Sequence, residues 1–229
     1  MTAQQILVAS LAQLGMALCL TGIVLRDRFR FSRCFTLYLA ACLAGNLSVT
    51  LWPEVFFTRG WYMVRQMLYG SLRLALALEL VYWTFSALPG AHQAARKTLL
   101  AVLGITFLSL VLLPDGGGVD SVRLVLFPRM LNGSIWLFAA TVGISLLYRV
   151  PVYPWHKAIM VGFAAYLTVF TVLTRLIAVL GWDFLDAVST LDPLSYVALL
   201  GYWTWAAWRT DEVAEADREV LSTLQPWRV

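Results

Sequence analysis

Residues 65–79, RQMLYGSLRLALALE, place two arginines and a glutamate inside an apolar stretch that runs from residue 61 to residue 88. At 1.5 Å per residue, an α-helix of this length rises about 42 Å, which exceeds the roughly 30 Å of hydrocarbon in a bilayer. The stretch is therefore long enough to cross a membrane, and Arg73 falls close to its midpoint. A charge at that depth is costly, so such residues usually face the interior of a helix bundle.

The composition of the whole chain indicates a membrane protein. Of its 229 residues, 60% are hydrophobic and only 13% are charged, whereas a soluble domain is about half apolar and about a quarter charged. This excess of apolar residues cannot be hidden in a core of this size, so lipid must solvate part of it. The length suits six to eight spans of about 20 residues and leaves no room for a second soluble domain.

Seven apolar segments are separated by proline and glycine, and they predict an all-α polytopic fold with seven transmembrane helices. The segments are 6–25, 34–52, 61–88, 98–113, 130–148, 158–180 and 193–208. Asp192 and Pro193 at the last boundary are expected to be the N-cap and first residue of that helix. The predicted domains are a seven-helix transmembrane domain, 1–208, and a short amphipathic cytoplasmic tail, 209–229.

Arginine and lysine in the loops predict the orientation, because they are enriched on the cytoplasmic side. One set of loops and the tail contain eleven: Arg26, Arg28, Arg30, Arg33, Arg96, Lys97, Arg149, Lys157, Arg209, Arg218 and Arg228. The other side has Arg59, Arg123 and Arg129. We therefore expect the N-terminus outside and the C-terminus in the cytoplasm of a plasma (inner) membrane. Positive charge follows the first apolar run, which favours a retained helix over a cleaved signal peptide.

Tryptophans near both ends of the segments, among them Trp52, Trp83, Trp155 and Trp203, predict an aromatic belt at the membrane surfaces. A second pattern is an internal similarity. YWTFSAL at 82–88 resembles YWTWAAW at 202–208, and TGIVLRDR at 21–28 resembles VGISLLYR at 142–149. These pairs would relate spans 1 and 3 to spans 5 and 7, as in a 3+1+3 arrangement of parallel repeats. Parallel repeats occur in transporters, although shared topology also produces such a pattern.

Polar residues in the third segment form one stripe. At about 100° per residue, Tyr62, Arg65, Gln66, Tyr69, Gly70 and Arg73 share one helix face. Farther along, the same face holds Leu76, Ala77 and Leu80, so the stripe ends at mid-membrane. The intramembrane acid Glu79 points about 120° away from Arg73 on this helix and is not its direct partner.

Other segments place polar groups at a similar depth, including Asn46, Asn132 and Arg175. If these groups converge with Arg65, Gln66, Tyr69 and Arg73, they form an outward-facing, net positive pocket with a closed floor. Arginine suits carboxylates, phosphates and lipid headgroups through its paired donors. In the alternative interpretation, Arg65 and Arg175 extend to the membrane surface or pair with acids of the last outer loop.

Catalytic motifs, metal-ligand spacings and signs of a bound cofactor are absent from the sequence, so an enzyme is not expected. His92 and His156 are predicted in inner loops, and Cys19, Cys34 and Cys42 are expected to be small packing residues. The favoured function is a membrane sensor or ligand-binding subunit that signals to a partner through the cytoplasmic loops and 209–229. The alternatives are a small-solute transporter and a structural subunit of a membrane complex. Nucleic acid is not an expected partner.

Overall fold

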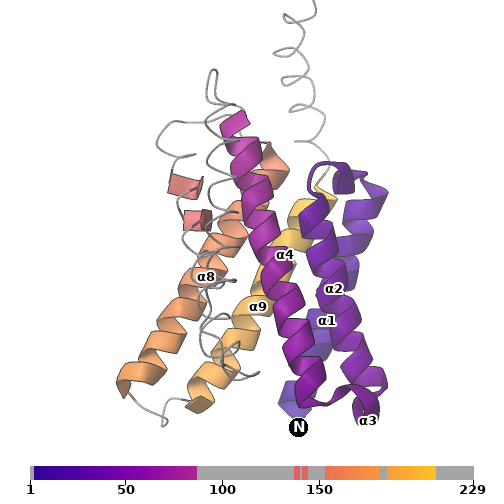
Figure 1. Cartoon of the computed structure of the whole chain (residues 1–229), viewed down its shortest axis with the longest axis vertical. Coiled ribbons are helices and arrows are strands. Elements are labelled where there is room, and N and C mark those ends of the chain that lie inside the picture. Colours follow the sequence, from indigo (N-terminus) through magenta and orange to yellow (C-terminus); the bar gives the residue numbers. More distant parts are fainter. Residues whose placement is uncertain (1–2, 87–136, 140, 144–152, 181–184, 210–229) are drawn as a thin grey trace, which may run out of the picture.

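The computed structural model describes residues 3–86, 137–139, 141–143, 153–180 and 185–209, and this part of the chain is entirely helical (Figure 1). Its helices are α1 (Ala3–Leu25), the 3-10 helix η1 (Arg28–Arg30), α2 (Arg33–Leu51), α3 (Pro53–Phe56), α4 (Arg59–Ser86), α8 (Pro154–Leu180) and α9 (Leu185–Trp208). The all-α prediction is thus confirmed for these residues. The predicted span 98–113 and most of 130–148 lie outside them.

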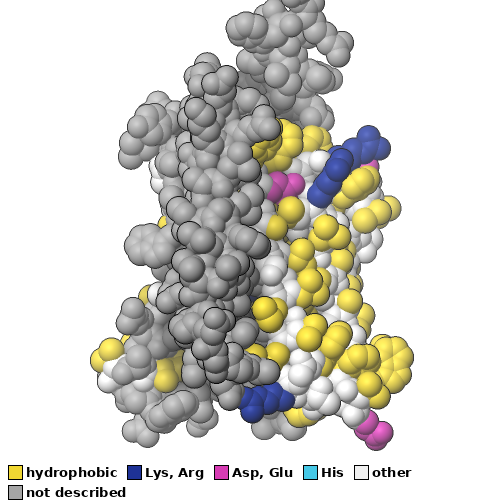
Figure 2. All heavy atoms as spheres, in the orientation of Figure 1, with side chains coloured by type: hydrophobic (Ala, Val, Ile, Leu, Met, Phe, Trp, Pro, Cys, Tyr) yellow, Lys and Arg dark blue, Asp and Glu magenta, His cyan; other side chains and the backbone are white. Residues whose placement is uncertain are grey.

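Three of these helices are long and apolar enough to cross a membrane, over Ile6–Leu25, Arg33–Leu51 and Pro154–Leu173. Many of their apolar side chains are at the surface; Leu7 and Leu14 of α1, for example, are 60% and 57% exposed. Hydrophobic side chains cover much of the visible face of the described helices, and charged ones gather mainly toward its two ends (Figure 2). Such a surface suits contact with lipid rather than water.

Helix α9 differs most from the prediction, because it begins at Leu185 and contains Pro193 in its interior. The expectation that Asp192 caps the helix and that Pro193 opens it is therefore wrong. Proline has no N–H to donate to the preceding turn, but membrane helices tolerate this because nearby side chains supply substitute hydrogen bonds. Next to Pro193, the Ser195 hydroxyl donates to the Asp192 carbonyl at 2.7 Å.

The helices pack in the order α4, α2, α1, α9 and α8, each against the next. The N-terminus and α3 lie at the same end of this bundle (Figure 1). Small residues let the helices approach closely. A methyl group on Gly15 of α1, for example, would lie only 3.1 Å from the Leu200 side chain of α9.

An aromatic cluster forms the core in the half of the bundle away from α3. Phe35 of α2 lies 5.5 Å from Trp155 and 4.9 Å from Trp203, in edge-to-face geometry, and Phe163 lies 4.7 Å from Trp203. Trp155 and Trp203 are 1% and 0% exposed. Their predicted place in an aromatic belt is wrong, because these two rings fill the space between helices. Trp52 and Trp83 are exposed, as a belt requires.

Glu79 of α4 caps the start of α2. Its carboxylate accepts hydrogen bonds from the Ser32 hydroxyl and from the backbone N–H groups of Arg33 and Cys34, each at 3.1 Å. The first N–H groups of a helix have no partner within it and carry partial positive charge. The negative charge of Glu79 therefore stabilises α2 and joins it to α4.

Arg28 makes the complementary contact at the end of α9. Its guanidinium donates to the carbonyl oxygen of Ala206 at 2.6 Å and to that of Arg209, where the helix carries partial negative charge. Arg28 is only 3% exposed and lies over the ring of Trp155. One arginine of the predicted topology-determining loop is thus also an internal helix cap.

The end of α4 and the start of α8 meet at the same end of the bundle. His156, predicted in a loop, instead lies in the first turn of α8, where it is buried. Its Nε2 donates to the carbonyl of Phe31 at 2.6 Å, and its ring stacks on Trp83 at 5.8 Å. The imidazole can be buried because this hydrogen bond and the stacked ring replace its contacts with water.

Candidate ligand-binding cavity

A cavity of about 600 Å³ opens between α2, α4, α8 and α9. It is lined by Tyr38, Cys42, Asn46, Tyr62, Arg65, Gln66, Tyr69, Arg73, Tyr166, Leu167, Phe170, Asp192, Pro193 and Tyr196. Its size falls within the roughly 300–1,000 Å³ of small-molecule sites. Five of the described lining residues are tyrosines, so the walls combine aromatic surface with hydroxyl groups.

Helix α4 supplies the basic wall. Tyr62, Arg65, Gln66, Tyr69 and Arg73 recur at intervals of three and four residues, which places them on one face of a helix, and all five line the cavity. The remaining faces of α4 carry apolar residues such as Val64 and Leu68, which are exposed. The amphipathic pattern thus orients the stripe toward the bundle interior.

Helix α2 supplies a facing stripe at four-residue spacing, Tyr38, Cys42 and Asn46. Arg65 bridges the two helices, because its Nη1 lies 3.2 Å from the carbonyl oxygen of Gly45 and 3.3 Å from Oδ1 of Asn46. Nearer the middle, the Tyr69 hydroxyl donates to the Cys42 carbonyl at 3.3 Å. These contacts fix Arg65 at the cavity wall.

Arg73 occupies the deepest part of the basic wall. Its guanidinium carbon lies 5.9 Å from the centre of the Tyr38 ring, which is within the range of a cation–π interaction. Its Nε atom is buried and has no hydrogen-bond partner among the described residues. A buried donor without a partner is unfavourable, so an acceptor placed in the cavity would gain from reaching it.

The opposite wall contains a carboxylate, Asp192 of α9. The hydroxyl of Tyr166 lies 3.4 Å from its Oδ1, and the rings of Tyr166 and Tyr196 lie 5.6 Å apart. Two guanidinium groups against one carboxylate give the described lining a net positive charge. The cavity therefore favours a ligand that carries a negative group, with polar atoms available on the far side.

Below Arg73 the stripe of α4 becomes apolar and tightly packed. Leu76, Ala77 and Leu80 are at most 1% exposed, and the aromatic cluster around Phe35 and Trp203 lies in the same half of the bundle. Along α4 the described cavity lining therefore ends at Arg73, and packed apolar side chains follow beneath it.

The structure brings together five of the predicted ligand-binding residues, Asn46, Arg65, Gln66, Tyr69 and Arg73. Arg175 belongs to α8, but its side chain is outside the described part, as is all of Asn132. Glu79 is separate from the cavity and caps α2. Arg65 contacts α2 through Gly45 and Asn46, and two of the outer acids predicted as alternative partners, Asp183 and Asp186, have side chains outside the described part.

Sequence reasoning missed the other residues that face the basic stripe: Tyr38, Cys42, Tyr166, Phe170 and Tyr196. A signal was present, because several recur every four residues, as in Tyr38, Cys42 and Asn46 or Asp192 and Tyr196. Unlike the stripe of the third segment, the face of Tyr38, Cys42 and Asn46 carries no arginine, so it does not stand out from its apolar neighbours in the sequence.

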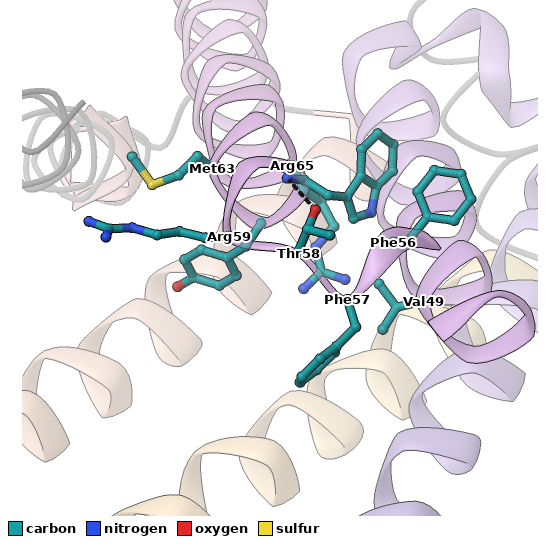
Figure 3. A pocket seen from close by; sticks show the side chains of 9 residues that line it. Val49, Phe56, Phe57, Thr58, Arg59, Met63 and Arg65 are labelled. Carbon is teal, nitrogen blue, oxygen red and sulfur yellow. Dashed lines mark hydrogen bonds between the residues drawn. The ribbon is translucent and has the colours of Figure 1, made fainter. Parts of the chain in front are cut away.

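A second pocket of about 470 Å³ lies at the end of the bundle near α3 and shares Tyr62 and Arg65 with the cavity. Phe56, Phe57 and Val49 lie on one side of it, and Arg59 and Met63 extend on the other (Figure 3). Arg65 and Tyr62 thus border both spaces.

No cluster of metal-ligating side chains occurs among the described residues. Comparison of the chain with protein families, with curated proteins and with solved structures found no match.

Proposed function

We propose that this chain is an integral membrane sensor or ligand-binding subunit whose outward-facing cavity takes a small organic anion. The observation that carries the proposal is the convergence of Arg65 and Arg73 on one cavity between α2, α4, α8 and α9. The proposal includes seven transmembrane helices, an outside N-terminus and a cytoplasmic C-terminus in a plasma (inner) membrane.

The lining indicates the class of ligand. A guanidinium binds carboxylate or phosphate through paired hydrogen bonds, and the tyrosine rings provide flat surfaces for an aromatic or aliphatic body. An aromatic carboxylate satisfies both requirements, with its charge near Arg73 and its ring among Tyr38, Tyr69 and Tyr166.

The floor beneath Arg73 favours a sensor over a transporter. A transport path needs polar groups that continue across the bundle, whereas Leu76, Ala77 and Leu80 are packed. Binding would be passed to a partner through the cytoplasmic loops and residues 209–229. A small-solute transporter is the alternative, and it requires the same cavity to open on the other side.

The test compares benzoate with its neutral analogue benzamide, using protein in lipid nanodiscs and isothermal titration calorimetry. Arg73→Gln should weaken benzoate binding roughly tenfold or more, because a hydrogen bond to a charged group contributes about 1.5–3 kcal/mol, and it should leave benzamide binding unchanged. Arg26→Gln, which replaces an exposed arginine that lines neither this cavity nor the pocket beside α3, is the control.

Equal benzoate affinity in wild type and Arg73→Gln would show that the site is wrongly assigned. Uptake of radiolabelled benzoate into proteoliposomes, lost in Arg73→Gln, would instead support the transporter.

A further inference from the structure

Asp192 gives the ligand cavity a negative charge that a simple anion would leave without a partner. It lines the cavity from α9, whereas Arg65 and Arg73 line it from α4. These two helices are not neighbours, because α2 and α1 lie between them in the packing order of the bundle. Within the described part of the chain, Asp192 forms no ion pair with either arginine. The cavity therefore presents positive and negative charge on separate walls.

The surroundings of Asp192 suit a bound cation. Its side chain is half-buried, and the Tyr166 hydroxyl is the one described side-chain group that hydrogen bonds its carboxylate, at Oδ1. Tyr196 lies one turn farther along the same face of α9, and its ring centre is 5.6 Å from that of Tyr166. A cation beside Asp192 would gain an ion pair and would lie close to aromatic rings, which attract positive charge.

The basic wall needs a negative group at the same time. The Nε atoms of Arg65 and Arg73 are buried and have no hydrogen-bond partner among the described residues. A simple anion would satisfy this wall, but it would repel the Asp192 carboxylate and leave it unpaired in a partly desolvated site. A ligand that carries both charges avoids this cost. Sites whose polar groups would be left unpaired discriminate strongly against ligands that lack the matching group.

The two charged walls are close enough for one small molecule to contact both. The Tyr166 hydroxyl, which donates to Asp192 at 3.4 Å, also lies within electrostatic range of Arg73. Tyrosine side chains occupy the space between the charges, since Tyr38 packs beside Arg73 and Tyr166 beside Asp192. A ligand that spans the walls would therefore place its body among aromatic rings.

We infer that the cavity binds a zwitterion, namely an amino acid with an aromatic side chain. Its carboxylate would bind Arg73, its ammonium would bind Asp192, and its ring would lie among the tyrosines. A primary ammonium has three hydrogen-bond donors, which suits a carboxylate with a hydroxyl beside it. The inference rests on the proposed function, because it concerns the same cavity, and it makes Asp192 a specificity-determining residue.

The test measures the binding of L-phenylalanine and of 3-phenylpropionate, which has the same carbon skeleton without the ammonium, to the full chain in lipid nanodiscs by calorimetry. Wild type should bind L-phenylalanine roughly tenfold more tightly or better, as expected for hydrogen bonds between charged groups. Asp192→Asn should abolish this preference by weakening the binding of L-phenylalanine alone. The control, Glu54→Gln, removes an exposed carboxylate that does not line the cavity and should retain the preference.

Equal affinity of wild type for the two compounds would overturn the inference, and so would an Asp192→Asn protein that still prefers L-phenylalanine. The wild-type comparison needs no variant, so it decides the question even if Asp192→Asn does not fold. The proposed function is tested separately, because it requires Arg73→Gln to weaken the binding of 3-phenylpropionate. Arg73-dependent binding of 3-phenylpropionate without any preference for L-phenylalanine would refute the amino-acid ligand and retain the site for an organic anion.

Discussion

Single charged residues inside the bundle have two different roles. Glu79 and Arg28 are matched to helix ends, where their charges complement backbone groups, whereas Arg73 lines the cavity with its guanidinium over the Tyr38 ring. Composition does not separate these roles, because each is a charge in an apolar segment. The difference appears only when the partner from another helix is known.

Replacing Glu79 with glutamine tests the cap. The amide is nearly the same size, but it loses the charge and one of the two oxygens that accept from α2. We expect a loss of about 1.5–3 kcal/mol, as for hydrogen bonds to charged groups, measured as a lower melting temperature in nanodiscs. Glu54→Gln removes an exposed carboxylate in the first turn of α3 and should leave the melting temperature unchanged. Equal melting of both variants would refute the capping role.

At the scale of elements, the positions of the helices were largely predictable and their contacts were not. The apolar segments 6–25, 34–52 and 61–88 match α1, α2 and α4 to within a few residues, because hydropathy depends on each residue alone. Pro193 misled the prediction of α9, since a proline can open a helix or lie within one. The stripe of α4 was visible from its spacing, but the facing residues of α2 and α9 depend on packing.

The contact between α2 and α4 can be tested at Gly45. A methyl group there would lie 2.8 Å from Cδ of Arg65 and would overlap the Tyr69 hydroxyl. Gly45→Ala should therefore destabilise the fold by about 1–3 kcal/mol, as overpacking does, and lower the melting temperature. Gly201→Ala is the matched control, because Gly201 is an exposed glycine within α9 with nothing close to an added methyl. It should be neutral or slightly stabilising. A Gly45→Ala protein that melts like this control would mean that the helices lie farther apart.

At the scale of the whole molecule, two contacts relate the directions of the helices. Arg28, just after α1, binds the end of α9, so α1 and α9 end on the same side. Trp83 near the end of α4 stacks on His156 at the start of α8, so these two helix ends lie at the same end of the bundle. The prediction of two further spans, 98–113 and 130–148, is compatible with this placement, and these segments lie almost entirely outside the described residues.

The orientation predicts which surface positions a membrane-impermeant maleimide reaches in intact cells, starting from a variant in which Cys19, Cys34 and Cys42 are replaced by alanine. Phe57→Cys, in the 79% exposed position between α3 and α4, should be labelled. Arg26→Cys, exposed in the loop after α1, should be labelled only after the cells are permeabilised. The physical reason is the excess of arginine and lysine beside Arg26, which favours the cytoplasmic side. The reverse pattern would place the cavity of Arg65 and Arg73 toward the cytoplasm, and its ligand would then be an intracellular anion. Labelling of both positions in intact cells would mean that α2 does not separate them across the membrane.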